Sequence, residues 1–397
     1  MPGALSDLLV IDLTRVLAGP YGTMLLGDFG AKIIKIEQPS RGDETRQWGP
    51  PFTTSGESAY FLCVNRNKQS LTLNLKTEAG REVLRDLVRR ADVLVENFKV
   101  GTMASLGLGY ESLRALNPGL IYCAITGYGQ TGPYCERPGY DTVIQAQGGL
   151  MSITGTVDGE PFKVGVAIVD VTAGLYAAIS ILAALHYRAR TGEGQFIDIA
   201  LFDTQLGWLA NVASAYLVSG QPPKRYGNAH ATIVPYQTMP TANGWLMLAV
   251  GNDSQFAALC RVLGYPEWAA DERFATNPAR VINRKALIPQ LEAIFRTHTT
   301  HEWIQVLIDA GVPCGPVNDI STALADPQAQ ARQMVQTVEH PISGPMPLVG
   351  PVPKLSATSA MIASAPPMLG EHTQAVLCEL LGYDEARVAA LHTAGAI

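Results

Sequence analysis

The first 130 residues alternate short apolar runs with stretches of helical spacing, and this alternation restricts the possible folds more than any other feature. The apolar runs are rich in β-branched residues and are separated by loops or by amphipathic stretches such as residues 77–90. They lie at residues 8–13, 32–37, 70–75, 92–96 and 120–125. Because strands joined by helices run parallel in one sheet, the sequence predicts an α/β fold with a doubly wound, Rossmann-like parallel sheet.

A change of composition near residue 220 indicates a second, smaller domain. The segment 219–230, SGQPPKRYGNAH, combines a Pro-Pro pair, basic residues and glycines with few apolar anchors, as linkers do. We therefore expect residues 1–218 to form the N-terminal part of a large domain, 219–230 a linker, and 231–325 a small α+β domain. Residues 326–397, which include a Pro- and Gly-rich tail, are expected to return to the large domain.

Charge and composition exclude several classes of protein. The formal net charge of the 397-residue chain is -6 and its pI is about 5.7, which argues against binding to nucleic acid or to an anionic membrane. The N-terminus lacks the features of a secretory signal, and the apolar run 171–185 is too short to span a membrane. The cysteines and histidines are scattered without metal-ligand spacing, so no metal site is predicted. We expect a cytoplasmic protein.

Asp170 is the residue whose position most strongly indicates chemistry. It stands between a strand-like run, Val164–Val169, and an apolar helix predicted over residues 171–185. An aspartate in the first turn of a helix can cap backbone N–H groups, and this junction is also where α/β proteins place ligands. Thr172 is an alternative cap, and Gly174 indicates a close approach by another backbone. The sequence leaves two roles open for Asp170, a cap or a carboxylate nucleophile in a partly desolvated space.

Polar loops follow the predicted strands and supply candidate binding groups. The loop at residues 38–58 contains Arg41 and Arg46, cations suited to anionic ligand groups, although ordinary surface solvation is the competing interpretation for either one alone. Two Gly-rich loops follow later strands, at residues 96–109 and 126–141. Their polar residues are Asn97, Lys99, Tyr140 and Asp141. Loops at the carboxyl ends of strands are where binding groups gather, so we expect a ligand site there.

Several motifs stand in a fixed order along almost the whole chain. They are VIDLTRVLAGPYGTMLLGDFGAKIIKIE (10–37), GDETR (42–46), NRNKQSLTLNLKT (65–77), DVLVENFKVGTMASLGLGY (92–110), GYGQTGPY (127–134), RPGYD (137–141), VDVTAGLYAAISILAAL (169–185), TGEGQFIDIAL (191–201), GVPCGPV (311–317) and LGEHT (369–373). In this order and spacing they resemble the class III coenzyme A transferases of the CaiB/BaiF type, which include formyl-CoA and carnitine CoA-transferases.

The resemblance implies a mechanism centred on Asp170. The family's catalytic aspartate attacks an acyl-CoA thioester, forms an aspartyl anhydride and then an aspartyl-CoA thioester, and passes CoA to a carboxylic acid by the reverse steps. A carboxylate at a helix N-terminus is expected to stay ionised at neutral pH, and backbone N–H groups of Gly148 and Gly149 are expected to hold the oxyanion. The family also implies an intertwined homodimer, with coenzyme A as substrate and no metal.

The resemblance also assigns contacts with coenzyme A. Val16, Leu17 and Ala18 are expected to line the adenine pocket. The other assigned residues are Leu73, Lys76, Asn97, Phe98, Lys99, Pro138, Gly139, Tyr140 and Asp141. Gln38 and Ser105 stand where well-known members have arginines for the CoA phosphates. The phosphate contacts are then expected from other basic residues, namely Arg41, Arg46, Lys76 or Lys99.

The segment YGNAHATIVPYQTM (226–239) lacks the glycine-rich lid of formyl-CoA transferases and looks more like the branch that moves CoA from succinyl-CoA to dicarboxylates. Arg46, Arg225 and His230 are the expected contacts of the substrate carboxylates. One alternative is an α-methylacyl-CoA racemase, whose acid–base chemistry needs a histidine where this chain has Tyr140, a poor base with an ordinary pKa of about 10. The other alternative is a non-catalytic acyl-CoA-binding protein.

Overall fold

The computed structural model describes residues 3–397 and divides the chain into two compact units. Unit 1 comprises the described residues up to Leu150 together with Val164–Ser219 and Pro327–Ile397. Unit 2 comprises Met151–Lys163 and Gly220–Asp326. Three separate stretches of chain therefore build unit 1. The short segment Met151–Lys163, which the sequence interpretation left in the large domain, groups with unit 2.

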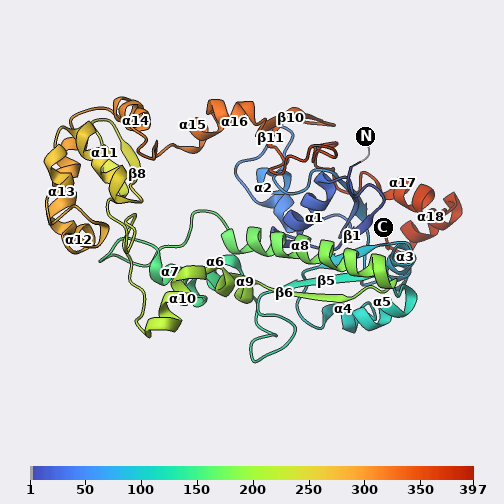
Figure 1. Cartoon of the computed structure of the whole chain (residues 1–397). Coiled ribbons are helices and arrows are strands. Elements are labelled where there is room, and N and C mark those ends of the chain that lie inside the picture. The colour runs from blue at the N-terminus through green and yellow to red at the C-terminus, as the bar shows by residue number, and fades with distance from the viewer. Residues whose placement is uncertain (1–2) are drawn as a thin grey trace. The chain divides into compact units, whose positions relative to one another are not determined.

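A six-stranded parallel sheet forms the centre of unit 1 (Figure 1). The strand order is β3-β2-β1-β4-β5-β6, which is the order of the doubly wound Rossmann sheet. The strands are β1 (Leu9–Asp12), β2 (Lys32–Glu37), β3 (Lys68–Thr72), β4 (Val93–Glu96), β5 (Ile121–Thr126) and β6 (Phe196–Ala200). The predicted parallel α/β sheet is confirmed, and β3 begins two residues earlier than the sequence indicated.

Helices cover both faces of this sheet, which is why its strands are apolar on both sides. One face packs against α3 and the C-terminal helices, and the other packs against α1 and α8. The helical elements of unit 1 are α1 (Ala18–Asp28), η1 (Glu44–Gln47), α2 (Ala59–Leu62), α3 (Glu78–Val88), α4 (Thr102–Ser105), α5 (Tyr110–Leu116), α6 (Asp141–Gln147), α8 (Ile168–Thr191), α9 (Leu201–Trp208), α10 (Ala210–Ser219), α16 (Pro327–Ala331), α17 (Thr373–Ala375), η3 (Val376–Leu380) and α18 (Glu385–Thr393). Helix α7 (Leu150–Ile153) spans a boundary between the two units.

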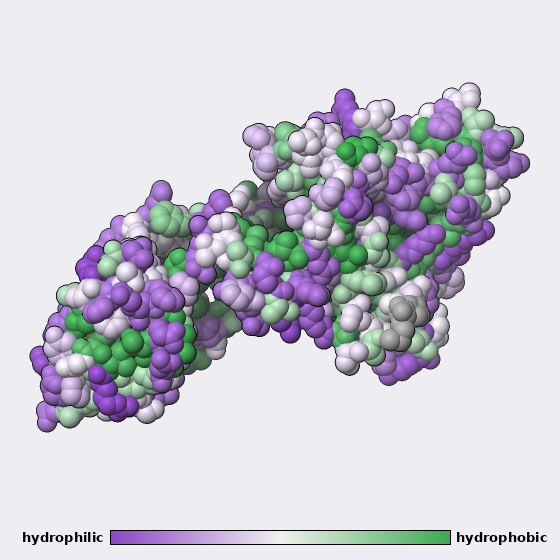
Figure 2. Space-filling model, turned by 90° about the horizontal axis from the view of Figure 1, so that it is seen from above, coloured by the Kyte–Doolittle hydropathy of each residue, from purple (hydrophilic) through white to green (hydrophobic). Residues whose placement is uncertain are grey.

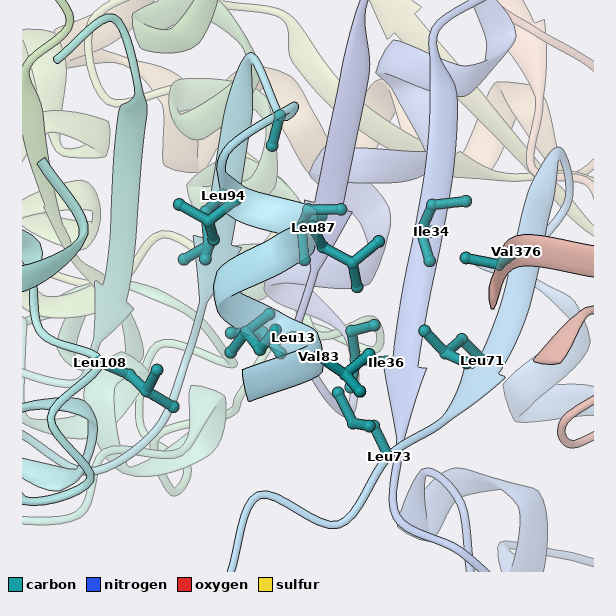
Figure 3. Packing of buried hydrophobic residues seen from close by; sticks show 14 of the residues in the cluster. Leu13, Ile34, Ile36, Leu71, Leu73, Val83, Leu87, Leu94, Leu108 and Val376 are labelled. Carbon is teal, nitrogen blue, oxygen red and sulfur yellow. The ribbon is translucent and has the colours of Figure 1, made fainter. Parts of the chain in front are cut away.

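Alternate residues of each strand supply the two hydrophobic cores. In β1, Ile11 points to the face covered by α3, and Val10 points to the face covered by α1 and α8. Figure 3 shows Ile36 of β2 beside Val83 of α3, with Ile34 of the same strand in the same cluster. Helix α3 is held there because its buried residues fall on one stripe of the helix.

The C-terminal stretch of unit 1 covers the open edge of the sheet. The backbone N–H of His372 donates to the carbonyl of Ser70 at 2.9 Å, and the N–H of Thr72 donates to the hydroxyl of Thr373 at 3.1 Å. Ser70 and Thr72 belong to β3, the strand at the end of the sheet. The edge of β3 is thereby protected from pairing with another chain. Upstream of this stretch, β10 (Val335–His340) and β11 (Gly344–Val349) form an antiparallel hairpin.

Unit 2 has its own small sheet and its own hydrophobic core. Its antiparallel strands, in the order β7-β8-β9, are β7 (Tyr236–Pro240), β8 (Trp245–Ala249) and β9 (Cys314–Pro316). Its helical elements are α11 (Asp253–Leu263), η2 (Pro266–Ala269), α12 (Asn277–Ile282), α13 (Arg284–Phe295), α14 (Thr300–Asp309) and α15 (Ile320–Ala325). Capping of α14 is complete, because Thr299 and Glu302 form a capping box.

The helix that carries Asp170 differs from the sequence prediction. Residues 164–169 do not form a strand, because α8 already begins at Ile168 and continues to Thr191. The β-branched residues before Asp170 favour a strand, but the N–H of Val169 donates to the carboxylate of Asp141 and so fixes the start of a helix. By length and composition α8 could cross a membrane, a test that buried core helices also pass. It packs against α1, β5 and β6.

Two glycines let α1 and α8 approach closely. A Cβ on Gly174 would lie 2.5 Å from the carbonyl oxygen of Ala18, and a Cβ on Gly22 would lie 2.8 Å from the carbonyl oxygen of Gly174. Both obstacles are backbone atoms of helices that share one core, so neither can move aside cheaply. The close backbone approach that Gly174 indicated in the sequence is present, and it places the start of α8 beside the start of α1.

We expect Gly174→Ala to lower the free energy of unfolding by about 1–3 kcal/mol, although alanine is the better helix former, because the added methyl group overpacks the α1–α8 contact. Urea denaturation of the variant and the parent protein measures the difference. Gly165→Ala is the control, since a Cβ there meets no atom within 4 Å. Equal unfolding midpoints for Gly174→Ala and the parent would show that the helices can separate without cost.

Candidate active site

Two adjoining cavities open where the parallel strands of unit 1 end. The larger has a volume of about 420 Å³ and the smaller about 240 Å³. Arg15, Glu44 and Phe98 line both cavities, so the two spaces meet at these residues. The carboxyl edge of a doubly wound sheet is the usual position of a ligand site.

The larger cavity combines apolar walls with cations. Leu73 and Leu106 contribute apolar surface, and Arg41, Lys76 and Gln38 contribute polar groups. Such a mixture suits a ligand with a flat apolar part and anionic substituents. No group of three His, Cys, Asp or Glu residues within 3–397 is placed to hold a metal ion.

Asp170 lines the smaller cavity, and a different carboxylate caps its helix. The Oδ2 atom of Asp141 accepts hydrogen bonds from the backbone N–H of Val169 at 2.8 Å and of Asp170 at 3.3 Å. Neither Asp170 nor Thr172 acts as the cap, since the Thr172 hydroxyl donates to the carbonyl of Ile168 within the helix. The question left open by the sequence is thereby answered: Asp141 caps α8, and the carboxylate of Asp170 is not used for that purpose.

Asp141 is itself held in place by Gln145, one turn further along α6. The Gln145 amide donates to Oδ1 of Asp141 at 2.5 Å, and its carbonyl oxygen accepts from the N–H of Val164 at 2.9 Å. Both side chains are buried. Together they attach the segment before α8 to α6, which fixes the direction in which α8 presents Asp170.

Burial, and secondarily the charge of Asp141, raises the pKa of Asp170 to about 7. The sequence interpretation expected the helix N-terminus to keep this carboxylate ionised at neutral pH. The helix start does stabilise a carboxylate, but that carboxylate belongs to Asp141, and Asp170 experiences its negative charge. Asp170 is therefore poised to gain or lose a proton near neutrality, as reactive carboxyl groups often are.

Buried charges brace the loop between β1 and α1. Val16 has a φ of 68°, a strained value for a β-branched residue. Its N–H donates to Oδ1 of Asp43 at 3.3 Å, and the ammonium of Lys35 donates to Oδ2 of Asp43 at 3.0 Å and to the carbonyl of Thr14 at 2.9 Å. The ion pair of Asp43 and Lys35 thus holds a strained turn that lines the smaller cavity.

Asn97 ties the next loop to the same turn. Its side chain accepts from the N–H of Arg15 at 2.9 Å and donates to the carbonyl of Arg15 at 2.7 Å. The Arg15 guanidinium lies over the ring of Phe98, 5.3 Å from its centroid. Glu96 accepts from the N–H of Phe98 at 2.7 Å, and burial raises the pKa of Glu96 to about 7. The Asn97 amide is thus occupied by the protein's own backbone.

Most of the residues predicted to contact coenzyme A line these cavities. Leu73 and Lys76 line the larger one. Those that line the smaller one are Val16, Leu17, Ala18, Asn97, Phe98, Lys99, Pro138, Gly139 and Tyr140, with Phe98 shared by both. Val16, Leu17 and Ala18, the residues expected to line an adenine pocket, share the smaller cavity with Asp170. Asp141 is a buried cap and lines neither cavity.

The residues expected to contact the substrate carboxylates are engaged elsewhere in their own units. Arg46 forms a two-point ion pair with buried Glu37, at 2.7 and 2.8 Å, and lines neither cavity. Arg225 and His230 belong to unit 2. There Arg225 donates to the carbonyls of Thr156 and Gly159, and His230 accepts from the N–H of Thr232. Arg46 therefore has a structural role, because its guanidinium neutralises a buried carboxylate.

The expected oxyanion donors also differ. The N–H of Gly148 donates to the carbonyl of Ile144 at 2.7 Å at the end of α6, so it is committed to the helix. Neither Gly148 nor Gly149 lines the cavity of Asp170. The first turn of α1, at Ala18, lies on that cavity instead and receives no side-chain cap.

The sequence did not single out some candidate functional residues of the site, among them Arg15, Glu44, Arg137 and Tyr60. Arg15, Glu44 and Arg137 line the smaller cavity. Tyr60 lies within electrostatic reach of Asp170, because burial and the Asp170 charge raise the pKa of its phenol to about 12. Arg15 and Arg137 stand in motifs already noted, after β1 and in RPGYD, and their basic charge in a post-strand loop was the available signal.

Comparisons with known proteins show the family of the chain. A family model described as CoA-transferase family III matches residues 5–373. The chain is 44% identical to human succinyl-CoA:glutarate CoA-transferase over 98% of its own length and 88% of that protein. It is 48% identical to succinate–glutarate CoA-transferase of Agrobacterium fabrum, covering 95% of each. The crystal structure of a CAIB/BAIF family protein from Brucella suis has a TM-score of 0.88 at 48% identity, over 96% of this chain and 100% of that one.

We expect Asp141→Asn to lower the pKa of Asp170 below about 7. Asparagine keeps a carbonyl oxygen to accept the N–H of Val169 but carries no charge, so the ionised form of Asp170 is less disfavoured. Carbon-13 NMR titration of the aspartate carboxyl carbons measures the shift, and the spectrum of Asp170→Asn assigns the resonance.

Asp7→Asn is the matched control for this titration, because Asp7 is an exposed carboxylate of unit 1. It should leave the titration midpoint of Asp170 unchanged. An unchanged midpoint in Asp141→Asn as well would mean that burial alone raises the pKa of Asp170.

Proposed function

The chain belongs to CoA-transferase family III and is a CoA-transferase, and we propose that it moves coenzyme A from succinyl-CoA to a dicarboxylic acid such as glutarate. Two relatives that are 44% and 48% identical to it carry names with this donor or acceptor. The proposal extends their reaction to this chain and assigns the chemistry to Asp170.

The observation that carries the proposal is the free carboxylate of Asp170 in the smaller cavity. Among residues 3–397, no hydrogen-bond donor or cation engages its side-chain oxygens. Its helix is capped by Asp141, so the carboxylate can attack without uncapping the helix. A partly buried, uncommitted carboxylate with a pKa of about 7 is a suitable nucleophile.

The proposed reaction has four balanced steps. The Asp170 carboxylate attacks the thioester carbonyl, the C–S bond breaks, and CoA leaves as a thiolate from a mixed anhydride. The thiolate attacks the aspartyl carbonyl, releasing the donor acid and leaving an aspartyl-CoA thioester. The acceptor carboxylate then attacks this thioester, giving a second anhydride and the thiolate. Attack of the thiolate on the acceptor carbonyl forms the new acyl-CoA and restores Asp170.

We propose that the two cavities divide the CoA molecule between them. The larger cavity, with Leu73, Arg41 and Lys76, suits the nucleotide with its phosphates. The smaller cavity then takes the pantetheine end, because the thioester carbon must meet Asp170. The uncapped first turn of α1 at Ala18 is a source of backbone N–H groups for the developing oxyanion.

A racemase reaction is less well supported by this geometry. Such a reaction needs a base and an acid facing one carbon atom. Tyr140, at the position where racemases carry histidine, is 64% exposed, and its neighbour Asp141 is occupied as the cap of α8.

We further propose that a second copy of the chain covers the apolar surface of α8, α9 and α10, as an intertwined homodimer would. Ile179 of α8 and Leu217 of α10 are 60% and 80% exposed. None of the residues of α10 is buried. Other exposed apolar residues of these helices are Leu175, Tyr176, Leu182, Leu206, Trp208, Tyr216 and Val218. Figure 2 shows hydrophobic residues reaching the surface, and a surface of this kind favours association.

The covalent mechanism predicts a trapped adduct at Asp170. After incubation with succinyl-CoA and then hydroxylamine, peptide mass spectrometry should find a hydroxamate on Asp170. Asp170→Asn should lack it and should lose transfer to glutarate by roughly 10³-fold or more, because its amide is not a nucleophile. Asp203 lies in the first turn of α9 and lines neither cavity. Asp203→Asn should therefore keep the hydroxamate on Asp170 and the parent rate of transfer. Transfer at the parent rate by Asp170→Asn would refute the mechanism.

The dimer predicts twice the chain mass of 42.5 kDa in sedimentation velocity. Ile179→Asp and Leu217→Asp should shift the protein towards the monomer, because each places a charge in the apolar surface of α8 and α10. Ile282→Asp is the matched control, since Ile282 is 81% exposed but lies in unit 2. A parent protein that sediments at the mass of one chain contradicts the dimer.

A further inference from the structure

Arg137 lies in the connection between β5 and α6 (Figure 1) and lines the same cavity as Asp170. A tight turn fixes its backbone, because the N–H of Arg137 donates to the carbonyl of Tyr134 at 2.9 Å. Its guanidinium lies over the ring of Tyr134, 3.8 Å from the ring centroid. A stacked guanidinium keeps its hydrogen-bonding edge free for a ligand.

A series of aromatic rings connects Arg137 to the core of unit 1. The Tyr134 ring meets Tyr128 edge-on at 5.7 Å, and the Tyr128 ring lies 5.9 Å from Phe202 of α9. The Tyr128 hydroxyl also donates to Gln147 of α6 at 2.7 Å. This arrangement restrains the guanidinium in advance of binding, so less entropy is lost when a ligand arrives.

The charge of Arg137 has no partner among residues 3–397, since no carboxylate lies within ion-pair distance of it. The cavity contains two other cations, Arg15 and Lys99. Arg15 lies at the junction with the larger cavity. Lys99 also borders a separate cavity beside Glu96. Arg137, in contrast, lines neither the larger cavity nor the cavity beside Glu96.

We propose that Arg137 binds the second carboxylate of the dicarboxylic substrate, the one that does not react. The inference rests on the proposed function. An acid with two carboxylates brings two negative charges into a cavity that already contains Asp170 and Glu44. A guanidinium can bind a carboxylate through two parallel hydrogen bonds, which compensates this repulsion and orients the reacting end.

The same contact serves the donor and the acceptor in turn. Succinyl-CoA and glutarate both carry a carboxylate a few bonds from the reacting carbonyl, and both reacting carbonyls must reach Asp170. One arginine in the cavity therefore selects dicarboxylic acids at both halves of the reaction. An acid of equal length with a methyl group in place of the second carboxylate leaves Arg137 unpaired and is disfavoured.

A competition experiment tests this assignment. Glutarate and pentanoate, at equal concentrations, compete for CoA from succinyl-CoA, and mass spectrometry measures the ratio of glutaryl-CoA to pentanoyl-CoA. The donor half-reaction cancels, so the product ratio equals the ratio of the two kcat/KM values. Arg137→Met should reduce the preference for glutarate by about 10- to 100-fold. Arg137→Lys should retain part of it, because it keeps the charge without the planar fork.

The matched control is Arg387→Met. Arg387 also lies over a tyrosine ring, at 3.6 Å from Tyr383, but it borders neither cavity of the site. It should leave the product ratio at the parent value. If Arg137→Met makes neither product, Arg137→Lys provides the ratio. A parent-like ratio in Arg137→Met, or in the lysine variant when that one is used, overturns the assignment. A parent protein that makes neither product refutes the proposed function instead.

Discussion

The hydrogen bonds from the start of α8 to Asp141 are the interaction on which the rest of the site depends. They satisfy the N–H groups of Val169 and Asp170 with a side chain from another helix. The helix therefore needs no capping from its own aspartate, and the Asp170 carboxylate is left available for chemistry. This arrangement disfavours the ionised form of Asp170, because burial and the negative charge of Asp141 both raise its pKa. Asp141 thus holds the start of α8 in place and, together with burial, raises the pKa of Asp170.

Buried charges perform a related task at the turn before α1, which lines the same cavity. The ion pair of Lys35 and Asp43 is fully buried and holds the turn at Val16 in a strained conformation. A buried pair is weak evidence for stability, since desolvation offsets most of its attraction. Its value here is geometric, because it directs the turn before α1 towards the cavity. The Gly22–Gly174 contact then brings the starts of α1 and α8 together.

Sequence reasoning predicted the parallel sheet and the family, and both are confirmed. Both follow from local patterns and contiguous motifs. The role of Asp170 as the nucleophile and the exact domain bounds stay predictions. Sequence reasoning was wrong about the strand at 164–169 and about the availability of Arg46 and of the Gly148 N–H group. Each of these groups forms a contact that its local sequence pattern does not reveal, since Val169 bonds to Asp141, Arg46 to Glu37 and the Gly148 N–H to Ile144. The basic residues of the cavity were also incompletely identified, because a cation such as Arg137 gains significance only when folding places it in the same cavity as Asp170.

The discontinuous chain path has a consequence for biosynthesis. All six strands of the parallel sheet precede residue 219. Val376 and Leu377, however, belong to the same core as α3, and the N–H of His372 donates to Ser70 of the edge strand β3. At about 5–20 residues per second, a ribosome needs on the order of 10–30 s to make the intervening chain. During that interval the nascent sheet has an incomplete core and an open edge. Such intermediates are prone to aggregate, so newly made chains would benefit from a chaperone until the final helices emerge.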